Sequence, residues 1–352
     1  MNESLWKKYK RVWIMLILVC AAMCFVGSVA FYQYYRLEVS NFSSNDGEGH
    51  GYYLYPDMSV DSLVSLMKQD YTLASERSWN AHRKYLHFIS IKPGYYRFPA
   101  HIGDKHLIRR VQSGTETPVH FTFNNSIRTR EQLAGQVAKY LLMDSVDILS
   151  RLSDDKYMSK FGMNAETSRC LFLPNTYEVY WTITPDDLFR RMEREYKAFW
   201  NDSRRHKADS IGLTPVEVAI VASIVESETR LKSDYPNIAS LYLNRVRKGM
   251  LLQACPTVIY ATGDLKLRRV LKRHLAIDSP YNTYKNRGLP PGPIRCANGT
   301  TIDVVLNAPK TDYLYMCANP DFSGTHIFSS HYSIHASAAR QYQHELNQRD
   351  IR

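Results

Sequence analysis

The sequence predicts an α+β protein that has one membrane-spanning helix near its N-terminus, a small mixed module after it, and a larger mixed domain towards the C-terminus. Three observations support this prediction. A long apolar run without charges lies near the start of the chain. Short helical and strand patterns follow one another in mixed order after it. Of the 352 residues, 44% are hydrophobic, which is enough for a buried core.

The apolar run, Val12–Phe31, has 20 residues without a charge, and a helix needs about 20 to cross a hydrocarbon layer of ~30 Å. Basic residues are unequally placed around it, with Arg36 after the run and Lys7, Lys8, Lys10 and Arg11 before it. By the positive-inside rule, residues 1–11 form a cytoplasmic tail, residues 12–31 span the membrane once, and the rest of the chain lies outside. A cleaved signal peptide is the alternative, because Ser28–Ala30 has the small-x-small form of a cleavage site.

The formal charge of +11 does not indicate nucleic acid, because this topology places the charge on the side of the membrane away from the genome and its transcripts. An acidic polymer outside the membrane is the better partner. Of six cysteines, two lie in the apolar run, and the other four form no C-x-x-C pair: Cys170, Cys255, Cys296 and Cys317. We therefore expect no metal site. Whether the four cysteines form one or two disulfides is not decided by the sequence.

Residues 32–51 are expected to form a polar tether, and residues 52–123 a small module. Ser59 is the predicted N-cap of a first helix. Alternation through Leu86, Phe88 and Ile91 predicts a strand, which a Pro93-Gly94 turn separates from a second one. Another helix should end at Gly114, before a last strand. The predicted order is helix, strand, turn, strand, helix, strand.

The larger domain should span residues 124–348. It begins with a helical pattern and continues with an apolar strand that a Pro-Asn-Thr turn at residues 174–176 interrupts. Two helices then carry the same start signal. Thr184 precedes Pro185 in the first, and Thr214 precedes Pro215 in the second, where Glu217 completes a T-x-x-E capping box.

The second of these helices contains a carboxylic acid inside an apolar run. All residues from Val218 to Val225 are Val, Ile, Ala or Ser, and Glu226 follows. At about 100° per residue, Glu226 shares its face with Ala222 and other small residues, whereas Glu228 points about 200° away. We expect the small residues to leave room for a ligand, and burial to keep Glu226 protonated as a general acid. The alternative is a solvated residue in the last turn.

Five segments, in their order and spacing, resemble the endolytic murein transglycosylase family, also called YceG-like. They are "FLPNTYEVYW" (172–181), "ASIVESET" (222–229), "LLQACPTVIY" (251–260), "YNTYKNRGLPPGPI" (281–294) and "NAPKTDYLYMCANPDFSGTHIFS" (307–329). The resemblance implies a single-pass inner-membrane enzyme with a LysM-like α+β subdomain and a YceG-like α+β catalytic domain in the periplasm. Such an enzyme cuts the β-1,4 bond between N-acetylmuramic acid (MurNAc) and N-acetylglucosamine (GlcNAc) in nascent glycan strands. It leaves 1,6-anhydro-MurNAc ends and uses no cofactor or metal.

By the same resemblance, the catalytic glutamate is Glu226. Polar and aromatic side chains suit sugar hydroxyls and ring faces. The residues expected to line the glycan groove are Asn175, Thr176, Tyr177, Gln253, Thr257, Tyr281, Asn282, Thr283, Tyr284 and His326. The alternative for each of them is a structural role, in turns or among core aromatics.

Two positions depart from the family pattern, since many members have aspartate where this chain has Asn175 and Cys255. Their absence favours a mechanism with one carboxyl, in which Glu226 protonates the leaving oxygen and then takes the proton of the muramoyl 6-hydroxyl. Glu228 should not be its partner. A disulfide between Cys255 and Cys296 is conceivable. A glycoside hydrolase and an inactive glycan-binding protein are the rival functions.

The module over residues 52–123 resembles a LysM-like fold through "IKPGYYRF" (91–98) and "VQSG" (111–114). It would either bind glycan or position the catalytic half. The expected partners are peptidoglycan strands, the inner membrane and the glycan polymerases of the elongation machinery, and no nucleic acid. An anchored enzyme is concentrated on strands that are still being made at the membrane, which fits a role in terminating their elongation.

Overall fold

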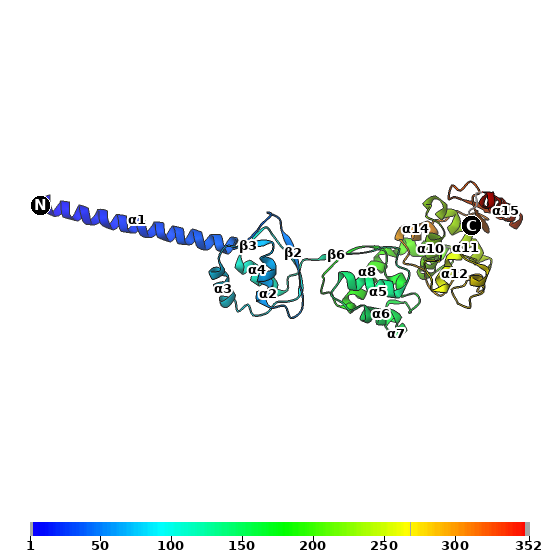
Figure 1. Ribbon diagram of the computed structural model, residues 1–352, viewed down its shortest axis with the longest axis horizontal. Coiled ribbons are helices and arrows are strands. Elements are labelled where there is room, and N and C mark those ends of the chain that lie inside the picture. Colours follow the sequence, from blue (N-terminus) through cyan, green and yellow to red (C-terminus); the bar gives the residue numbers. More distant parts are fainter. Residues whose placement is uncertain (1–2, 268, 349–352) are drawn as a thin grey trace. The chain divides into compact units, whose positions relative to one another are not determined.

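The structure is a computed structural model that describes residues 3–267 and 269–348, with side chains except those of residues 3–8, 11, 33, 36–39, 343, 346 and 347. The chain forms two compact units (Figure 1). The first comprises Met1–Val119 together with Val179–Thr182, and the second comprises His120–Glu178 and Ile183–Arg352. Both units mix helices with strands, which confirms the predicted mixed architecture.

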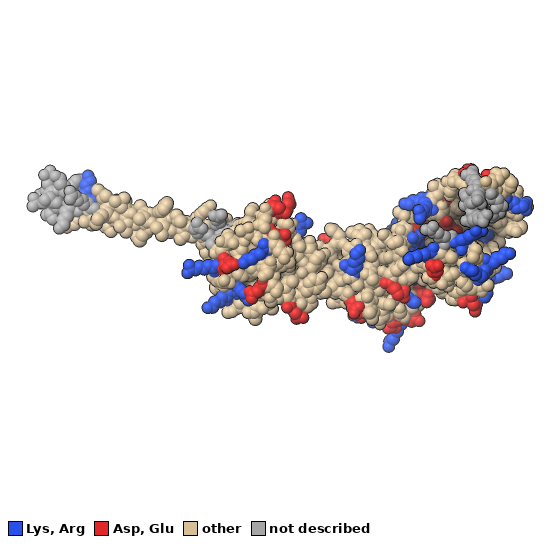
Figure 2. Space-filling model, viewed as in Figure 1, with Lys and Arg blue, Asp and Glu red and all other residues tan. Residues whose placement is uncertain are grey.

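The first helix, α1 (Glu3–Val39), contains the predicted apolar run. Its stretch Val12–Tyr32 has 21 residues with a mean hydropathy of 2.7, and none of it is buried. Figure 2 shows this stretch without charged residues. Among the described residues, α1 is the one helix that by itself is long and apolar enough to span a membrane. Residues 1–2 of the predicted tail, and the side chains of Lys7, Lys8, Arg11 and Arg36, lie outside the described parts.

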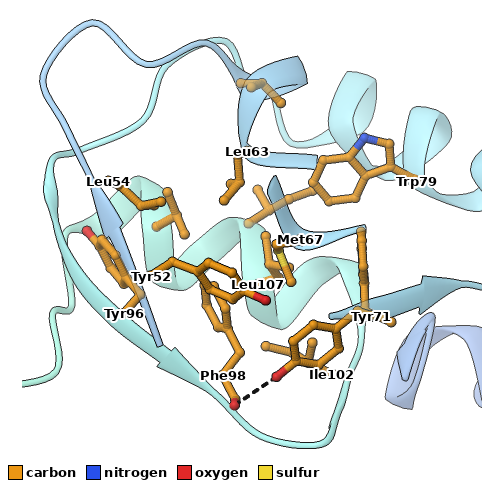
Figure 3. Packing of buried hydrophobic residues seen from close by; sticks show 14 of the residues in the cluster. Tyr52, Leu54, Leu63, Met67, Tyr71, Trp79, Tyr96, Phe98, Ile102 and Leu107 are labelled. Carbon is orange, nitrogen blue, oxygen red and sulfur yellow. Dashed lines mark hydrogen bonds between the residues drawn. The ribbon is translucent and has the colours of Figure 1, made fainter. Parts of the chain in front are cut away.

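The first unit also contains a three-stranded sheet in the order β3-β1-β5, a two-stranded sheet of β2 and β4, and three helices. The bounds of these elements are β1 (Phe42–Ser44), β2 (His50–Leu54), α2 (Val60–Met67), β3 (Tyr71–Leu73), α3 (Glu76–Tyr85), β4 (Gly94–Phe98), β5 (His101–Ile102) and α4 (Asp104–Ser113). Tyr52 and Tyr96 are paired across β2 and β4, and both are buried. Figure 3 shows them in an aromatic core, where the hydroxyl of Tyr71 donates to the carbonyl oxygen of Phe98 at 3.0 Å.

Two predictions for this unit are wrong. The tether does not reach residue 51, because α1 continues to Val39 and β1 pairs with β3 and β5, with Phe42 fully buried. No strand covers residues 86–91, because Ser75 caps α3 and the chain leaves that helix through Leu86. The predicted caps are confirmed: Ser59 accepts from the backbone N–H of Ser62, and Gly114 ends α4 with a φ of 78°.

The remaining elements begin at the domain boundary, where β6 pairs with β7, and β8 and β9 form a second hairpin. Their bounds are β6 (Val119–Phe123), α5 (Arg130–Tyr140), α6 (Ser145–Ser153), α7 (Asp155–Met158), η1 (Ser159–Phe161), η2 (Ser168–Leu171), β7 (Asn175–Val179), α8 (Pro185–Phe199), α9 (Asp202–Ser210), α10 (Pro215–Glu228), η3 (Lys232–Asp234), α11 (Tyr235–Arg247), α12 (Cys255–Thr262), α13 (Lys272–Leu275), α14 (Gly299–Leu306), β8 (Tyr315–Ala318), β9 (His326–Ser329) and α15 (Tyr332–Gln348). Asn175 and Thr176 of the predicted turn instead begin β7.

The centre of the second unit is α10, which packs against α11, α12 and α14. The predicted capping box is present: Thr214 accepts from the backbone N–H of Glu217, whose side chain accepts from the backbone N–H of Thr214. Every residue from Val218 to Glu226 is buried, as a helix that is apolar on all sides requires. The local sequence of α10 therefore determines both its start and its position in the core.

Candidate active site

Glu226 is enclosed by its own chain. Its side chain is 5% exposed and accepts three hydrogen bonds. Oε1 accepts from the backbone N–H of Asn298 at 3.0 Å and from the hydroxyl of Thr301 at 2.6 Å, and Oε2 accepts from the amide of Asn125 at 3.1 Å. Both oxygens are therefore held in place by donors from the segment before α5 and from the start of α14.

The small-residue face of α10 does not open on a ligand site. The hydroxyl of Ser223 accepts from the backbone N–H of Ile294 at 3.1 Å, and Thr301 of α14 reaches Glu226 on the same face. The small residues thus make room for α14 and the segment that precedes it. Glu226 lines none of the described cavities and is hydrogen-bonded to other parts of the fold, so its role as general acid stays a prediction.

Glu228, two residues further on, lines a cavity of about 380 Å³. The hydroxyl of Tyr242 on α11 donates to Oε1 of Glu228. Burial raises the pKa of Glu228 from its ordinary 4.5 to about 7, and this effect outweighs the lowering by Tyr242 and by the charge of Arg245. A carboxyl with a pKa near neutral is protonated often enough to donate a proton and ionised easily enough to lose it. Among the residues that line this cavity in the described chain, Glu228 is the one carboxylic acid.

Arg245 holds one wall of the cavity in place. Its guanidinium donates to the carbonyl oxygens of Leu252 at 2.8 Å, Leu251 at 3.1 Å and Leu314 at 2.7 Å. Gln253 follows with a φ of 52°, in the left-handed region that is costly for a residue with a side chain. Such a conformation persists only where the surroundings fix it, and here the guanidinium does so.

The structure brings three of the predicted groove residues to this cavity, namely Gln253, Tyr284 and His326. Tyr284 contacts Cys255, with 3.2 Å between its hydroxyl and the sulfur. The orientation of the His326 ring is fixed by the buried Asp234, because Nδ1 of the ring lies 2.8 Å from Oδ2 of that carboxylate. These residues surround Glu228 and not Glu226.

Four other predicted groove residues are buried and support the cavity from outside it. The hydroxyls of Thr257 and Thr283 lie 2.8 Å apart, and Thr283 also accepts from the backbone N–H of Ala254 at 3.0 Å. The amide of Asn282 donates to two backbone carbonyls, and the hydroxyl of Tyr281 donates to Glu166 at 2.6 Å. Their hydrogen bonds fit the structural alternative.

The last three predicted groove residues lie on β7. Asn175 and Tyr177 line a separate hollow of about 490 Å³, together with Asn298 at the start of α14. Thr176 is exposed, and its hydroxyl lies 2.8 Å from that of Thr122. The sequence therefore groups residues that the structure divides between two sites.

All six cysteines are free thiols, so the conceivable disulfide between Cys255 and Cys296 is not formed. Cys255 lines the cavity, and burial raises the pKa of its thiol. In residues 3–267 and 269–348, no three His, Cys, Asp or Glu side chains lie together as metal ligands.

Sequence patterns contain little sign of the residues that complete the cavity. Tyr242 and Arg245 are three positions apart on α11, so they share a face. That spacing is the one local signal for either residue. Asp234 and His326 are 92 positions apart, and no pattern in the sequence connects them.

Comparisons with known proteins agree with one another. The model of the YceG-like family matches residues 52–341. An endolytic murein transglycosylase of Bacillus subtilis is 28% identical over 309 residues, which cover 83% of this chain and 84% of the relative. One of Streptococcus pneumoniae is 24% identical over 345 residues, and the match covers 88% of this chain and 61% of the longer relative.

A crystal structure of a yceG-like protein from Listeria monocytogenes has the same fold. It superposes with a TM-score of 0.55 at 24% identity, and the match covers 82% of this chain and 98% of that protein.

Proposed function

Because the chain belongs to the YceG-like family, we propose that it is a lytic transglycosylase that cuts the glycan strands of peptidoglycan. Two relatives that match over more than four fifths of this chain are named endolytic murein transglycosylases. The cavity around Glu228 supports the same activity.

The observation that carries the proposal is a single carboxyl with a pKa of about 7 in a cavity lined with polar and aromatic side chains. Glu228 is the proton donor to the glycosidic oxygen. Gln253 and Tyr284 line the same cavity and would contact the sugar. In this proposal the catalytic residue is therefore Glu228 and not the predicted Glu226.

The bond that breaks is the β-1,4 bond between MurNAc and GlcNAc. As the leaving oxygen takes the proton of Glu228, positive charge develops at the anomeric carbon of MurNAc. The 6-hydroxyl oxygen of the same sugar closes on that carbon and gives up its proton to a base in the cavity. The products are a 1,6-anhydro-MurNAc end and a free GlcNAc 4-hydroxyl, and no water is consumed.

A single carboxyl favours this reaction over hydrolysis. Hydrolases use two carboxylates that are about 5–9.5 Å apart, the second of which activates water or attacks the sugar. The 6-hydroxyl is already attached to the substrate, and well-oriented intramolecular groups reach effective molarities of about 10⁵–10⁸ M. Closure of the 1,6-anhydro ring can therefore be faster than attack by water, and it needs no second carboxylic acid.

We further propose that α1 anchors the enzyme in the inner membrane, with the N-terminus in the cytoplasm and both units in the periplasm. Its length and apolarity support an anchor and are also compatible with a signal sequence. An anchored enzyme would meet strands near the polymerases that make them and so end their elongation. The first unit, proposed as a LysM-like subdomain, would hold or position the strand.

The test compares Glu228→Gln with Glu226→Gln in the full-length protein in detergent, on purified glycan strands. Glu228→Gln should lower the rate of cleavage by about 10²–10⁴-fold, because it removes the general acid and keeps the shape of the side chain. Glu226→Gln should still cleave, while its midpoint of urea unfolding falls. An active Glu228→Gln variant would refute the assignment.

The mass of the products separates the possible functions. Muramoyl ends that are one water lighter than reducing ends are the expected result. Reducing ends would instead show a hydrolase. A protein that binds strands without cutting them would be a glycan-binding protein on this scaffold.

A further inference from the structure

A paired aspartate and histidine lie at the same cavity as Glu228, and the proposed reaction gives this pair no role. His326 on β9 lines the cavity, and Asp234 lies behind it with 8% of its surface exposed. The distance from Nδ1 of His326 to Oδ2 of Asp234 is 2.8 Å. The contact joins two segments that are 92 residues apart, so the fold, and not local sequence, holds the pair together.

The position of Asp234 shows that its carboxylate is directed at the ring. Asp234 stands at the N-cap of α11, where an aspartate commonly accepts a hydrogen bond from its own helix. Here the side chain makes no such bond and turns to His326 instead.

This contact fixes which nitrogen of His326 can act as a base. A carboxylate can only accept, so Nδ1 of the neutral ring carries the hydrogen and Nε2 carries the lone pair. Within the described residues, no hydrogen bond from a protein group to Nε2 is present. Nε2 is therefore the ring atom able to accept a proton from a ligand in the cavity.

We propose that His326, oriented by Asp234, is the general base that takes the proton of the muramoyl 6-hydroxyl. The inference rests on the proposed transglycosylase function. From the sequence, one glutamate was expected to carry out both proton transfers. Here Glu228 gives the proton to the leaving oxygen, and His326 takes the proton of the 6-hydroxyl.

The step balances without a further reactant. The bond from the anomeric carbon to the leaving oxygen breaks, and that oxygen takes the proton of Glu228. The bond from the anomeric carbon to the 6-oxygen forms, and the 6-hydroxyl proton passes to Nε2 of His326. The site then holds a carboxylate and an imidazolium, and proton exchange with solvent restores the starting forms.

Asp234→Asn tests the positioning role. The amide can donate to Nδ1, which moves the ring hydrogen to Nε2 and removes the lone pair that the base needs. A related change of tautomer lowers kcat by about 10⁴-fold in serine proteases, where an aspartate also orients the catalytic histidine. For the full-length protein in detergent, on purified glycan strands, we expect kcat for anhydro ends to fall by at least about 10²-fold, with KM unchanged within about twofold.

His326→Ala tests the base itself, since it leaves a space that free imidazole can enter. The variant should lose at least about 10²-fold in kcat, and added imidazole should restore part of the loss. His331→Ala is the matched control, because His331 is exposed, lies two residues beyond β9 and lines no described cavity. It should keep the activity of the wild type. If His326→Ala does not fold, His326→Gln takes its place, with the same loss and no rescue.

The outcomes separate the two proposals. If wild type yields no anhydro ends, the proposed function fails and this inference fails with it. If wild type yields them and either Asp234→Asn or His326→Ala keeps kcat within about threefold, Glu228 acts alone and only the inference fails. A fall in Asp234→Asn activity that appears in KM, with kcat unchanged, would also overturn it.

Discussion

Two glutamates that are two residues apart on α10 have opposite surroundings. Both oxygens of Glu226 accept hydrogen bonds from the chain that covers α10, whereas Glu228 borders a cavity and accepts from Tyr242. The helix turns by about 200° between them, and this change of direction decides which carboxyl can meet a ligand. The sequence predicted that the two would not act as a pair, and their separate environments agree.

The pKa of Glu228 predicts how the rate of cleavage depends on pH. Since burial raises this pKa to about 7, the protonated donor is lost as the pH rises through 7. Cleavage should therefore slow by about tenfold per pH unit well above 7. Initial rates on purified strands between pH 5 and 9 measure the effect. A rate that stays constant from pH 6 to 9 would contradict it.

The same shift predicts how the stability of the fold depends on pH. Between about 4.5 and 7 the folded protein binds this proton more tightly than the unfolded chain does, so the contribution of Glu228 to stability falls as the pH rises through that window. Glu228→Gln removes this term. The variant should gain free energy of unfolding relative to wild type at pH 8 and not at pH 4.5. Urea unfolding at the two values provides the comparison.

Single residues were harder to predict than their types. The motifs predicted Glu226 and ten groove residues, and three of the ten, Gln253, Tyr284 and His326, line one cavity together with Glu228. Periodicity shows which residues share a face of a helix but not what covers that face, so it could not show that Glu228 lines a cavity while the oxygens of Glu226 are hydrogen-bonded within the fold. Asp234, Tyr242 and Arg245 come from other segments, and only the folded chain brings them together.

At the scale of elements, the starts of helices were predicted correctly from their capping residues, whereas a short strand was predicted where none forms. Ser59, Thr184 and Thr214 cap the helices that they were expected to cap. Each cap is a contact within four residues, so its chemistry is local. The alternation near residue 88 suggested a false strand, since Phe88 is buried in the core by a loop after α3. Apolar residues that alternate with polar ones do not by themselves require a sheet partner.

The small-residue face of α10 makes a prediction about stability. Ser223 accepts from the buried backbone N–H of Ile294, whereas Ser227 donates only to the carbonyl oxygen of Ser223 in its own helix. Ser223→Ala should lower the free energy of unfolding by about 1–3 kcal/mol, because it leaves the N–H of Ile294 unpaired. Ser227→Ala is the matched control and should change it by less than about 0.5 kcal/mol. Equal losses in urea unfolding would show that α10 does not depend on this contact.

At the scale of the whole chain, a mixed fold, an apolar N-terminal helix and the family were all predictable from the sequence. The apolar run and five motifs have signals that do not depend on fine packing. The residue at which the tether ends was not predictable. Asn41 is polar and Phe42 is a single apolar residue among polar neighbours, yet both are fully buried. Their burial depends on β3 and β5, which come later in the chain.

The proposed anchor predicts the orientation of the whole molecule. In spheroplasts that express the protein with a tag at each end, added protease should remove the C-terminal tag and leave the N-terminal one. The reason is that the basic residues precede an apolar stretch of 21 residues. A cytoplasmic protein serves as the control for leakage. A C-terminal tag that is protected until detergent is added would contradict the orientation, and a mature protein without its N-terminal tag would indicate a cleaved signal sequence.

The guanidinium of Arg245 has a consequence for the order in which the enzyme matures. It bonds the carbonyl oxygen of Leu314, 69 positions along the chain, and the pair of Asp234 and His326 spans 92 positions. Contacts this distant form late, because long loops must close first. A chain in which these contacts have not yet formed therefore carries Glu228 without the enclosure that raises its pKa. If Glu228 is the proton donor, as proposed, we expect such a chain to cut no glycan strand until the hairpin of β8 and β9 has packed in place.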